Sequence, residues 1–458
     1  MSATVFSTWR NAIREAMDAR PERAPGAFVR AMRSGYADVA RGQQTGDNSR
    51  PALSERLQAS YGFTFADDGY PIRPTATGTL TSPAFGASVI RDYIDRYIET
   101  VSPALFFAGE AAAEASVARM EPARDGLAFY YGDDSLRVAR NPDRHYSALT
   151  QSQYLIAFQR LADACADAPF GRRERARRTE YWREIEQAML KSLLVPVKEG
   201  GVIYPHAAGP ILAGTPTQPN EVQLNAWLSA AQNISSYARS RDDATAGALF
   251  DETIGALEKL VPTFDAPKYS ITRPVSAGFG TFRLEFPIGT EGNWISDAVV
   301  RVPGEGDYPI AESRDARYGR WRNAVVGSDG GGSPWIVRKW LTMNLVLNRL
   351  SYPSPNVLRL NVEAANEGTA LLLWARRTYD PVEARAADGD YVEIARARVQ
   401  RGANTLAFPI DWDAADLVVY PATSAVHDGN VVRLERLAAI TGNQVLAEWA
   451  QRWRSYSL

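Results

Sequence analysis

Ile90-Arg-Asp-Tyr-Ile-Asp-Arg-Tyr-Ile-Glu-Thr-Val101, with Ser102-Pro103 directly after it, is the segment from which the fold can be inferred. Its apolar residues recur every three or four positions, which predicts an amphipathic helix. Proline is well suited to the first turn of a helix, so Pro103 predicts that a second helix, over residues 104–120, begins at once. Two helices joined by so short a turn are expected to form an antiparallel hairpin.

The same pattern recurs along the chain. It predicts helices over residues 146–168, 175–194, 221–239 and 242–260, and two more at 430–440 and 443–456. Residues 6–19 and 27–40 also show helical patterning. The eight helices from residue 90 onward make four pairs. Antiparallel pairs of this kind predict a mainly α protein, an (α/α) toroid or barrel whose inner helices line a cleft.

Strand patterns interrupt the helical pairs between residues 269 and 420. Thr281-Phe-Arg-Leu-Glu-Phe286 and Val357-Leu-Arg-Leu-Asn-Val362 alternate apolar and polar residues. Several such strands, separated by Gly, Pro and Asp, predict a β-sandwich-like insertion. Residues 335–350 fit a strand or a helix. We predict an N-terminal arm with helices (1–84), the first part of the toroid (85–268), the β-rich insertion (269–424) and the last helical pair (425–458).

The composition limits the classes of function. The chain has 458 residues, 45% of them hydrophobic, and a formal net charge of −2, so it offers no general attraction for nucleic acid. Its one cysteine, Cys165, excludes an internal disulfide and a cysteine metal cluster. The 11 Trp, 20 Tyr and 16 Phe fit a sugar-binding protein or a large aromatic core. We predict no cofactor and no metal.

No segment has the apolar length of a membrane span or a signal peptide. The expectation is a cytoplasmic protein, or a periplasmic or secreted one if a leader has been removed. A homodimer is left open by the sequence.

The connection between the fourth and fifth predicted helices, residues 195–225, is unusually long. Long connections inside compact domains are usually functional or disordered. Apolar residues such as Val202, Ile203 and Leu212 argue against disorder, because they can anchor the loop to a core. The loop carries Tyr204 and one of the three histidines, His206.

Four segments resemble the C-terminal domain of the D-glucuronyl C5-epimerase family. Tyr146-Ser-Ala-Leu-Thr-Gln-Ser-Gln153 is similar to that family's YSAMAQGQ segment, and Pro216-Thr-Gln-Pro-Asn-Glu-Val-Gln-Leu-Asn225 is similar to YPTTPSSFVLNG. Leu260-Val-Pro-Thr-Phe-Asp265 resembles MLPLYD, and Glu448-Trp-Ala-Gln-Arg-Trp-Arg-Ser-Tyr456 resembles FVKRWKSY. They occur in the family's order, over roughly residues 85–270 and 425–458.

The resemblance implies an (α/α) barrel that inverts C5 of glucuronate within heparan-type polymers, with tyrosines as acid and base. Two of the three tyrosine positions differ here. Thr215 stands where one tyrosine is expected, and Val426 stands where another opens the family's YHTTH segment, although His427 matches that segment. Tyr269 is the nearest match to the third tyrosine, in IYDLRH. The acid–base set of this chain is therefore altered.

Removing the C5 proton of a uronate requires a base, a stabiliser for the enolate-like carboxylate and an acid on the opposite face. The predicted catalytic residues are Tyr269, His206, His427 and Tyr204. For His206 the alternative is a structural hydrogen bond to the backbone, and for His427 it is an exposed position at a helix start.

The predicted substrate-binding residues combine arginine, amides, aromatic rings and one carboxylate. Arg273 suits bidentate recognition of a carboxylate, with an ordinary surface position as the alternative. Tyr146, Thr150 and Gln153 share one stripe of a helix, which favours a cleft-lining face over a solvated one. Trp227 is a stacking platform or a core residue. The full set is Tyr146, Gln153, Asn225, Trp227, Arg273, Asn430 and Glu199.

The leading hypothesis is an enzyme that abstracts the C5 proton of an acidic, uronate-containing polysaccharide. The partner is thus an acidic polysaccharide or oligosaccharide, not nucleic acid or a membrane. The first alternative is a polysaccharide lyase or glycoside hydrolase on the same toroid. A hydrolase needs paired carboxylates, for which Glu199, Glu221 and Asp428 are the candidates. The second is a non-catalytic protein that binds or assembles polysaccharide.

Overall fold

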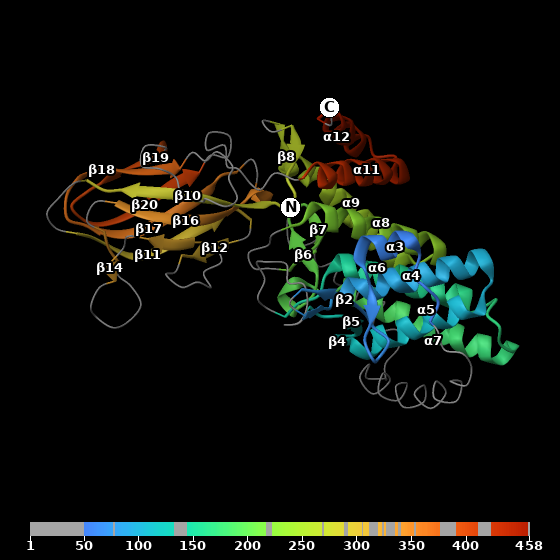
Figure 1. The fold of residues 1–458 in the computed structure, drawn as a ribbon. Helices are drawn as coiled ribbons and strands as arrows, with labels where there is room; N and C mark the ends of the chain where they lie inside the picture. Colours follow the sequence, from blue (N-terminus) through green and yellow to red (C-terminus); the bar gives the residue numbers. More distant parts are fainter. Residues whose placement is uncertain are drawn as a thin grey trace. The chain divides into compact units, whose positions relative to one another are not determined.

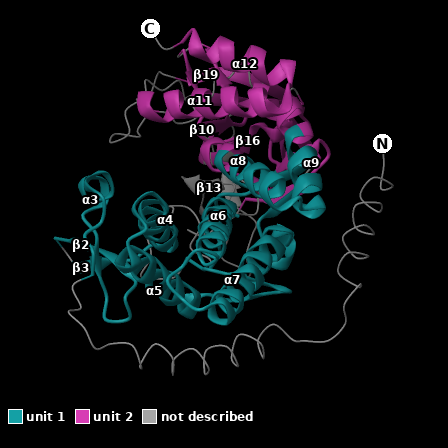
Figure 2. Ribbon diagram, turned by 90° about the vertical axis from the view of Figure 1, so that its right-hand side faces the viewer, with its two compact units in different colours: residues 1–205, 210–216, 229–254 teal, residues 206–209, 217–228, 255–458 magenta. Residues whose placement is uncertain are grey.

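In the computed structural model the chain forms two compact units (Figure 2). The first comprises residues 1–205, 210–216 and 229–254, and the second comprises 206–209, 217–228 and 255–458. The structure describes residues 50–76, 78–131, 144–216, 222–267, 270–287, 292–304, 306–310, 319–322, 325–326, 335–337, 340–351, 354–375, 391–410 and 423–456.

Two helical hairpins form the body of the first unit (Figure 1). α4 (Pro83–Thr100) pairs with α5 (Pro103–Arg119), α6 (Ala148–Ala164) pairs with α7 (Arg172–Leu193), and α4 also packs against α6. The turn after α4 is tight because Val101 adopts a left-handed φ of 55° and donates its N–H to the Tyr97 carbonyl. These four helices confirm the predictions from apolar spacing.

The contact between α4 and α6 depends on Gly86. A Cβ at this position would collide with the hydroxyls of Ser116 and Tyr154, so only glycine allows the close approach. Beside it, Tyr154, Phe158 and Trp182 are fully buried, and their rings stack at centroid distances of 5.4 and 5.5 Å. Part of the aromatic content therefore belongs to the core.

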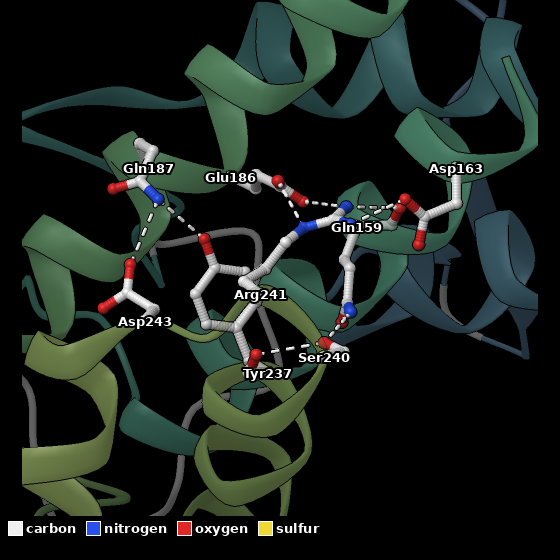
Figure 3. Close-up of polar contacts among 8 residues, drawn as sticks. All are labelled: Gln159, Asp163, Glu186, Gln187, Tyr237, Ser240, Arg241 and Asp243. Carbon is white, nitrogen blue, oxygen red and sulfur yellow. Dashed lines mark hydrogen bonds and ion pairs between the residues drawn. The ribbon is translucent and has the colours of Figure 1, made fainter. Parts of the chain in front are cut away.

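The next two helices are α8 (Leu224–Arg241) and α9 (Ala244–Leu260), as predicted. Figure 3 shows the end of α8, where Arg241 donates to both oxygens of Glu186, at 2.9 and 3.0 Å, and to Asp163 at 2.7 Å. Glu186 is only 2% exposed. Arg241 thus links α8 to α6 and α7 through a largely buried ion pair.

Shorter elements complete the first unit. They are α3 (Glu55–Tyr61), a sheet of β1 (Thr64–Phe65), β2 (Pro71–Thr75) and β3 (Gly78–Leu80), and the hairpin of β4 (Glu121–Ala123) and β5 (Gly126–Ala128). The long connection before α8 contains the hairpin of β6 (Ile203–His206) and β7 (Gly209–Leu212). Val202, Ile211 and Leu212 are fully buried there, which confirms that apolar residues anchor this loop.

The last helical pair belongs to the second unit. α11 (Ser424–Thr441) and α12 (Gln444–Arg454) pack together, and the side chains of Thr423 and Asn443 cap them by accepting from backbone N–H groups. Gly442 ends α11 with a φ of 68°. α11 begins at Ser424 rather than at the predicted Asn430. All eight predicted helices therefore occur in the described part of the chain.

Two larger antiparallel sheets also belong to the second unit (Figure 1). The first has the order β13 (Gly319–Arg322), β16 (Trp340–Asn348), β10 (Ala277–Glu285), β18 (Gly368–Ala375), β19 (Tyr391–Val399). The second has the order β14 (Val325–Val326), β15 (Trp335–Val337), β11 (Asn293–Val302), β17 (Asn356–Ala364), β20 (Gly402–Ile410), and β12 (Gly306–Pro309) pairs with β11.

One apolar core joins the two sheets. Phe282 and Leu345 from the first sheet and Val300, Leu360 and Phe408 from the second belong to it. Successive side chains of a strand point to opposite faces, so the alternation read in the sequence becomes one buried and one exposed face. Residues 335–350, whose pattern fitted strand or helix, are mainly strand.

Some predictions cannot be compared with the structure. The helices predicted at residues 6–19 and 27–40 lie outside the described residues. Within the described part of the chain, none of the helices combines the length and the apolar character needed to cross a membrane.

Candidate active site

A short hairpin in the second unit gathers the polar residues of the candidate site. Pro262, in the helical turn Val261–Phe264, directs the chain out of α9 into β8 (Asp265–Ala266), which pairs antiparallel with β9 (Ile271–Thr272). β9 lies against α11, and the end of α12 lies against the Val261–Phe264 turn. Side chains from these segments meet around Asp265.

Asp265 is the centre of this cluster. It is 8% exposed and its carboxylate accepts from three side chains. Oδ2 contacts Nε and Nη2 of Arg452 at 3.0 and 2.8 Å, while Oδ1 accepts from Trp453 Nε1 at 3.2 Å and from the Tyr456 hydroxyl at 3.0 Å. A buried carboxylate with this many donors is fixed in place.

Tyr456 and Arg452 are the members of the cluster that reach solvent. The Arg452 side chain is 48% exposed, and Tyr456 is half-buried. Burial, together with the hydrogen bond to Asp265 and its negative charge, raises the pKa of Tyr456, and Arg452 opposes this. The Tyr456 phenol therefore keeps its proton, which it donates in a hydrogen bond to the Asp265 carboxylate.

His427 is buried behind Tyr456, with ring centroids 6.2 Å apart. The Thr272 N–H donates to Nδ1 at 3.1 Å, so the ring proton belongs on Nε2, which lies 3.1 Å from the Trp453 carbonyl. Both ring nitrogens are thus bonded to the main chain. This geometry favours a positioning role for His427 over direct contact with a substrate.

Asn430 and Arg273 support the same hairpin. Asn430 is fully buried and donates from Nδ2 to the Thr272 hydroxyl at 3.2 Å, while its Oδ1 has no hydrogen-bond partner within the described residues. Arg273, 8% exposed, donates from Nε to the Asp265 carbonyl at 3.0 Å. The structure thus brings three predicted residues together: His427, Asn430 and Arg273.

The start of α8 lies beside the segment that follows Arg273. The Leu224 N–H donates to the Pro274 carbonyl at 2.9 Å. Asn225 is half-buried there, but Trp227 is fully buried, which favours its core alternative over a stacking platform.

The predicted loop residues have other partners. In the second unit, His206 accepts from the Ala208 N–H at 3.1 Å. Burial lowers the pKa of His206, and a hydrogen bond with the Leu350 backbone partly opposes this. In the first unit, Glu199 forms an ion pair with Arg124, and Tyr204 is half-buried in β6. His206 therefore resembles its structural alternative, a loop histidine bonded to the backbone.

The predicted polar stripe lies only partly on α6, because α6 begins at Ala148, two residues after Tyr146. Tyr146 is fully buried and donates to the Ser192 carbonyl at 2.9 Å. Thr150 is 1% exposed and lies 2.8 Å from the Tyr131 hydroxyl. Gln153 is half-buried, and its Oε1 has no hydrogen-bond partner in the described structure. Tyr146 and Thr150 thus occupy the core instead of a cleft-lining face.

Sequence reasoning missed Asp265, Arg452 and Tyr456 as candidate site residues. All three lie in the segments that carry the family resemblance, so a signal was present, but their contact across the chain was not visible. Tyr269, the predicted proton donor, lies outside the described residues. The described residues contain no group of three or more His, Cys, Asp or Glu arranged to hold a metal ion.

Comparison with solved structures adds little. The chain is similar to the endo-β-1,4-glucanase CMCax from Acetobacter xylinum, with 8% sequence identity and a TM-score of 0.33. The similarity covers 48% of this chain and 59% of the glucanase chain, so this protein spans little more than half of that structure. A similarity this low supports no inference about function.

Comparison with protein families is informative. A search of curated proteins found no match. Residues 141–273, however, match the model of the D-glucuronyl C5-epimerase C-terminus. This segment includes three of the four resembling motifs and ends at Arg273, next to the hairpin described above. The match agrees with the resemblance seen in the sequence: this segment of the chain is similar to the C-terminal domain of the D-glucuronyl C5-epimerases.

Proposed function

We propose that this protein is a uronate-processing carbohydrate enzyme that abstracts the C5 proton of an acidic polysaccharide, with an acid–base set different from that of typical family members. The observation that carries the proposal is the family match at residues 141–273. It is supported by the hydrogen-bonded cluster of Tyr456, Asp265 and Arg452, which places a phenol, a carboxylate and a cation together.

Each member of the cluster has a role in the proposed reaction. Arg452 is exposed enough to contact the carboxylate of a uronate and to stabilise it as negative charge develops. The proposed base is Tyr269, which takes the C5 proton, and the proposed acid is Tyr456, which returns a proton to C5 from the opposite face. In the structure the Tyr456 hydroxyl is held by Asp265. Arg273 and His427 position the hairpin. Roles for Tyr204, His206, Asn225 and Gln153 remain predictions.

The proposal also includes the arrangement of the helical pairs. We propose that the helical pairs close into the (α/α) toroid, with the β-rich residues 269–424 inserted before the last pair. The antiparallel pairs α4/α5, α6/α7 and α11/α12 support this arrangement. An experimental structure in which α4, α6 and α11 do not belong to one ring of helices would contradict it.

Deuterium exchange tests the activity. The protein is incubated in D2O with heparosan and with other glucuronate-containing polymers, and C5 is followed by NMR. An epimerase incorporates deuterium at C5 and inverts the configuration of that carbon. A lyase also removes the C5 proton but then yields an unsaturated sugar. Absence of exchange and of unsaturated product with every uronate polymer tested would contradict the proposal.

A hydrolase receives less support from the described residues. Its two carboxyl groups must face each other across a sugar ring. Glu199 is bound to Arg124, and the carboxylate of Asp265 is occupied by Arg452, Trp453 and Tyr456. New reducing ends without C5 exchange would favour this reaction.

A further inference from the structure

The outer face of the second sheet carries a large aromatic side chain. Along β11, Ile295, Ala298 and Val300 point into the core, whereas Trp294 is 39% exposed on the opposite face. A single exposed apolar residue is common and needs no explanation by itself. Trp294 differs because its surroundings form a hollow.

The hollow has a volume of about 640 Å³ and lies on β11, β17 and β20. Volumes of this size are typical of small-molecule sites. Strand register places three of its residues in one row across the sheet: Trp294 pairs with Glu363, and Glu363 pairs with Ala403, whose small side chain leaves space beside the carboxylate. The lining residues are Trp294, Ser296, Asn361, Val362, Glu363, Ala403, Asn404 and Thr405.

A β-bulge shapes one wall of the hollow. The register between β11 and β17 shifts between Ile295 and Asp297, so Ser296 is an extra residue in β11. Both Ser296 and Asp297 are exposed. Bulges bend a strand and redirect its side chains, often beside binding sites. This bulge lies immediately after Trp294.

The polar groups of the hollow are already oriented. Thr405 donates its hydroxyl proton to Asn361 Oδ1 at 3.1 Å, which fixes the amide. Asn361 Nδ2 then has no further partner within the described residues, and Glu363 has neither an ion pair nor a hydrogen bond there. Asn404 differs, because its amide is bonded to the Gln400 and Gly402 carbonyls, each at 2.7 Å, and so shapes the turn.

This combination matches the chemistry of a pyranose. A sugar ring has an apolar C–H face, which suits an indole, and a rim of hydroxyls, which suits an amide donor beside a carboxylate acceptor. The lining contains one carboxylate, Glu363, and no lysine or arginine. A uronate would meet repulsion here without a compensating cation, so the charge favours a neutral sugar.

We propose that Trp294, together with Asn361 and Glu363, forms a binding site for neutral hexopyranosyl or pentopyranosyl units of a polysaccharide. Trp294 stacks on the ring, Asn361 Nδ2 donates to a hydroxyl oxygen, and the Glu363 carboxylate accepts from hydroxyl protons. The site lies on the β-rich part of the chain and uses none of the residues of the proposed active site.

Binding measurements test this site. The full chain is titrated with cello-, xylo-, laminari-, manno- and galacto-oligosaccharides, and with hyaluronan and heparosan oligosaccharides as acidic comparators. We expect binding to at least one neutral series and weaker binding of the acidic ones at this site. Trp294→Ala should weaken the neutral interaction about tenfold or more, since a central aromatic contact is lost, and Asn361→Ala should weaken it less.

Trp340→Ala is the matched control. Trp340 is a partly exposed tryptophan on β16 of the other sheet, where Arg283 lies over its ring. The Trp340→Ala substitution should leave the binding of neutral oligosaccharides unchanged. Circular dichroism checks that every variant folds. Absence of binding to all neutral series would overturn the proposal, as would binding that survives Trp294→Ala. Equal binding of acidic chains through Trp294 would refute the neutral specificity. C5 deuterium exchange is measured in a separate experiment. The neutral-sugar site and the proposed activity can therefore each fail without the other.

Discussion

The hydroxyl of Tyr456 donates to Oδ1 of Asp265 across 3.0 Å, although 191 residues separate the two in the chain. Asp265 follows the helical turn after α9, and Tyr456 follows the last helix. Both lie in segments that resemble the D-glucuronyl C5-epimerases. Their contact gives the proposed acid–base set a specific candidate, which single-residue variants can test.

Tyr456→Phe removes the phenolic proton and keeps the ring. If Tyr456 transfers a proton, C5 deuterium exchange should fall about a hundredfold or more, because proton-transfer groups contribute factors of this size. Exchange is measured by NMR at saturating polymer. Tyr61→Phe, on the exposed Tyr61 of α3, is the control and should retain full activity. Undiminished exchange in Tyr456→Phe would assign Tyr456 a structural role.

Asp265→Ala should destabilise the second unit more than Asp265→Asn. Alanine leaves the buried Trp453 Nε1 without its acceptor and releases Arg452, for which we expect a loss of about 2 kcal/mol or more in the free energy of unfolding. Asparagine keeps one acceptor oxygen and should lose less. Urea unfolding measures both. Equal stability of the two variants would show that these hydrogen bonds contribute little.

Arg241→Ala should destabilise the first unit by about 3–5 kcal/mol, because it leaves Glu186 buried without its cation (Figure 3). Arg396→Ala is the control: Arg396 pairs with Glu393 on the surface, its side chain is 70% exposed, and its loss should cost less than about 1 kcal/mol. Thermal and urea unfolding compare the two. Similar losses would mean that the Arg241 contacts are no stronger than a surface pair.

Local pattern predicted much of this fold. Helix and strand periods depend on neighbouring residues, so the helical pairs and the β-rich segment could be read directly from the sequence. Residues 335–350 remained ambiguous because a short apolar run fits either structure. The Arg452 and Tyr456 partners of Asp265 come from distant segments, which periodicity does not record.

Polar residues at the start of α6 and just before it show that partners distant in the sequence also decide where a candidate site residue lies. Tyr146 and Thr150 looked like a cleft-lining stripe because neither is apolar. In the structure both are buried, since the Ser192 carbonyl and the Tyr131 hydroxyl satisfy their hydrogen bonds. A polar side chain is compatible with a core when a partner is supplied from elsewhere, and a single sequence does not reveal that partner.

Glu114, on α5, gives a prediction for pH dependence. Burial, with the negative charge of Glu110, raises its pKa from 4.5 to about 7, and Arg178 opposes the rise. Above pH 4.5 the unfolded chain has released a proton that the folded protein still holds, so this group makes stability fall as the pH rises from about 4.5 to about 7.

Glu114→Gln cannot ionise, so its unfolding free energy should lose this pH dependence and exceed that of the wild type at pH 8, by at most about 3 kcal/mol. Below pH 4.5, where Glu114 is protonated in both states, the two proteins should be nearly equal in stability. Glu99→Gln, at an exposed position of α4, is the control and should follow the wild-type curve. Urea unfolding between pH 4 and pH 8 measures all three. Parallel curves for Glu114→Gln and wild type would show that Glu114 is ionised in the folded protein at little cost, and that Arg178 outweighs the effect of burial.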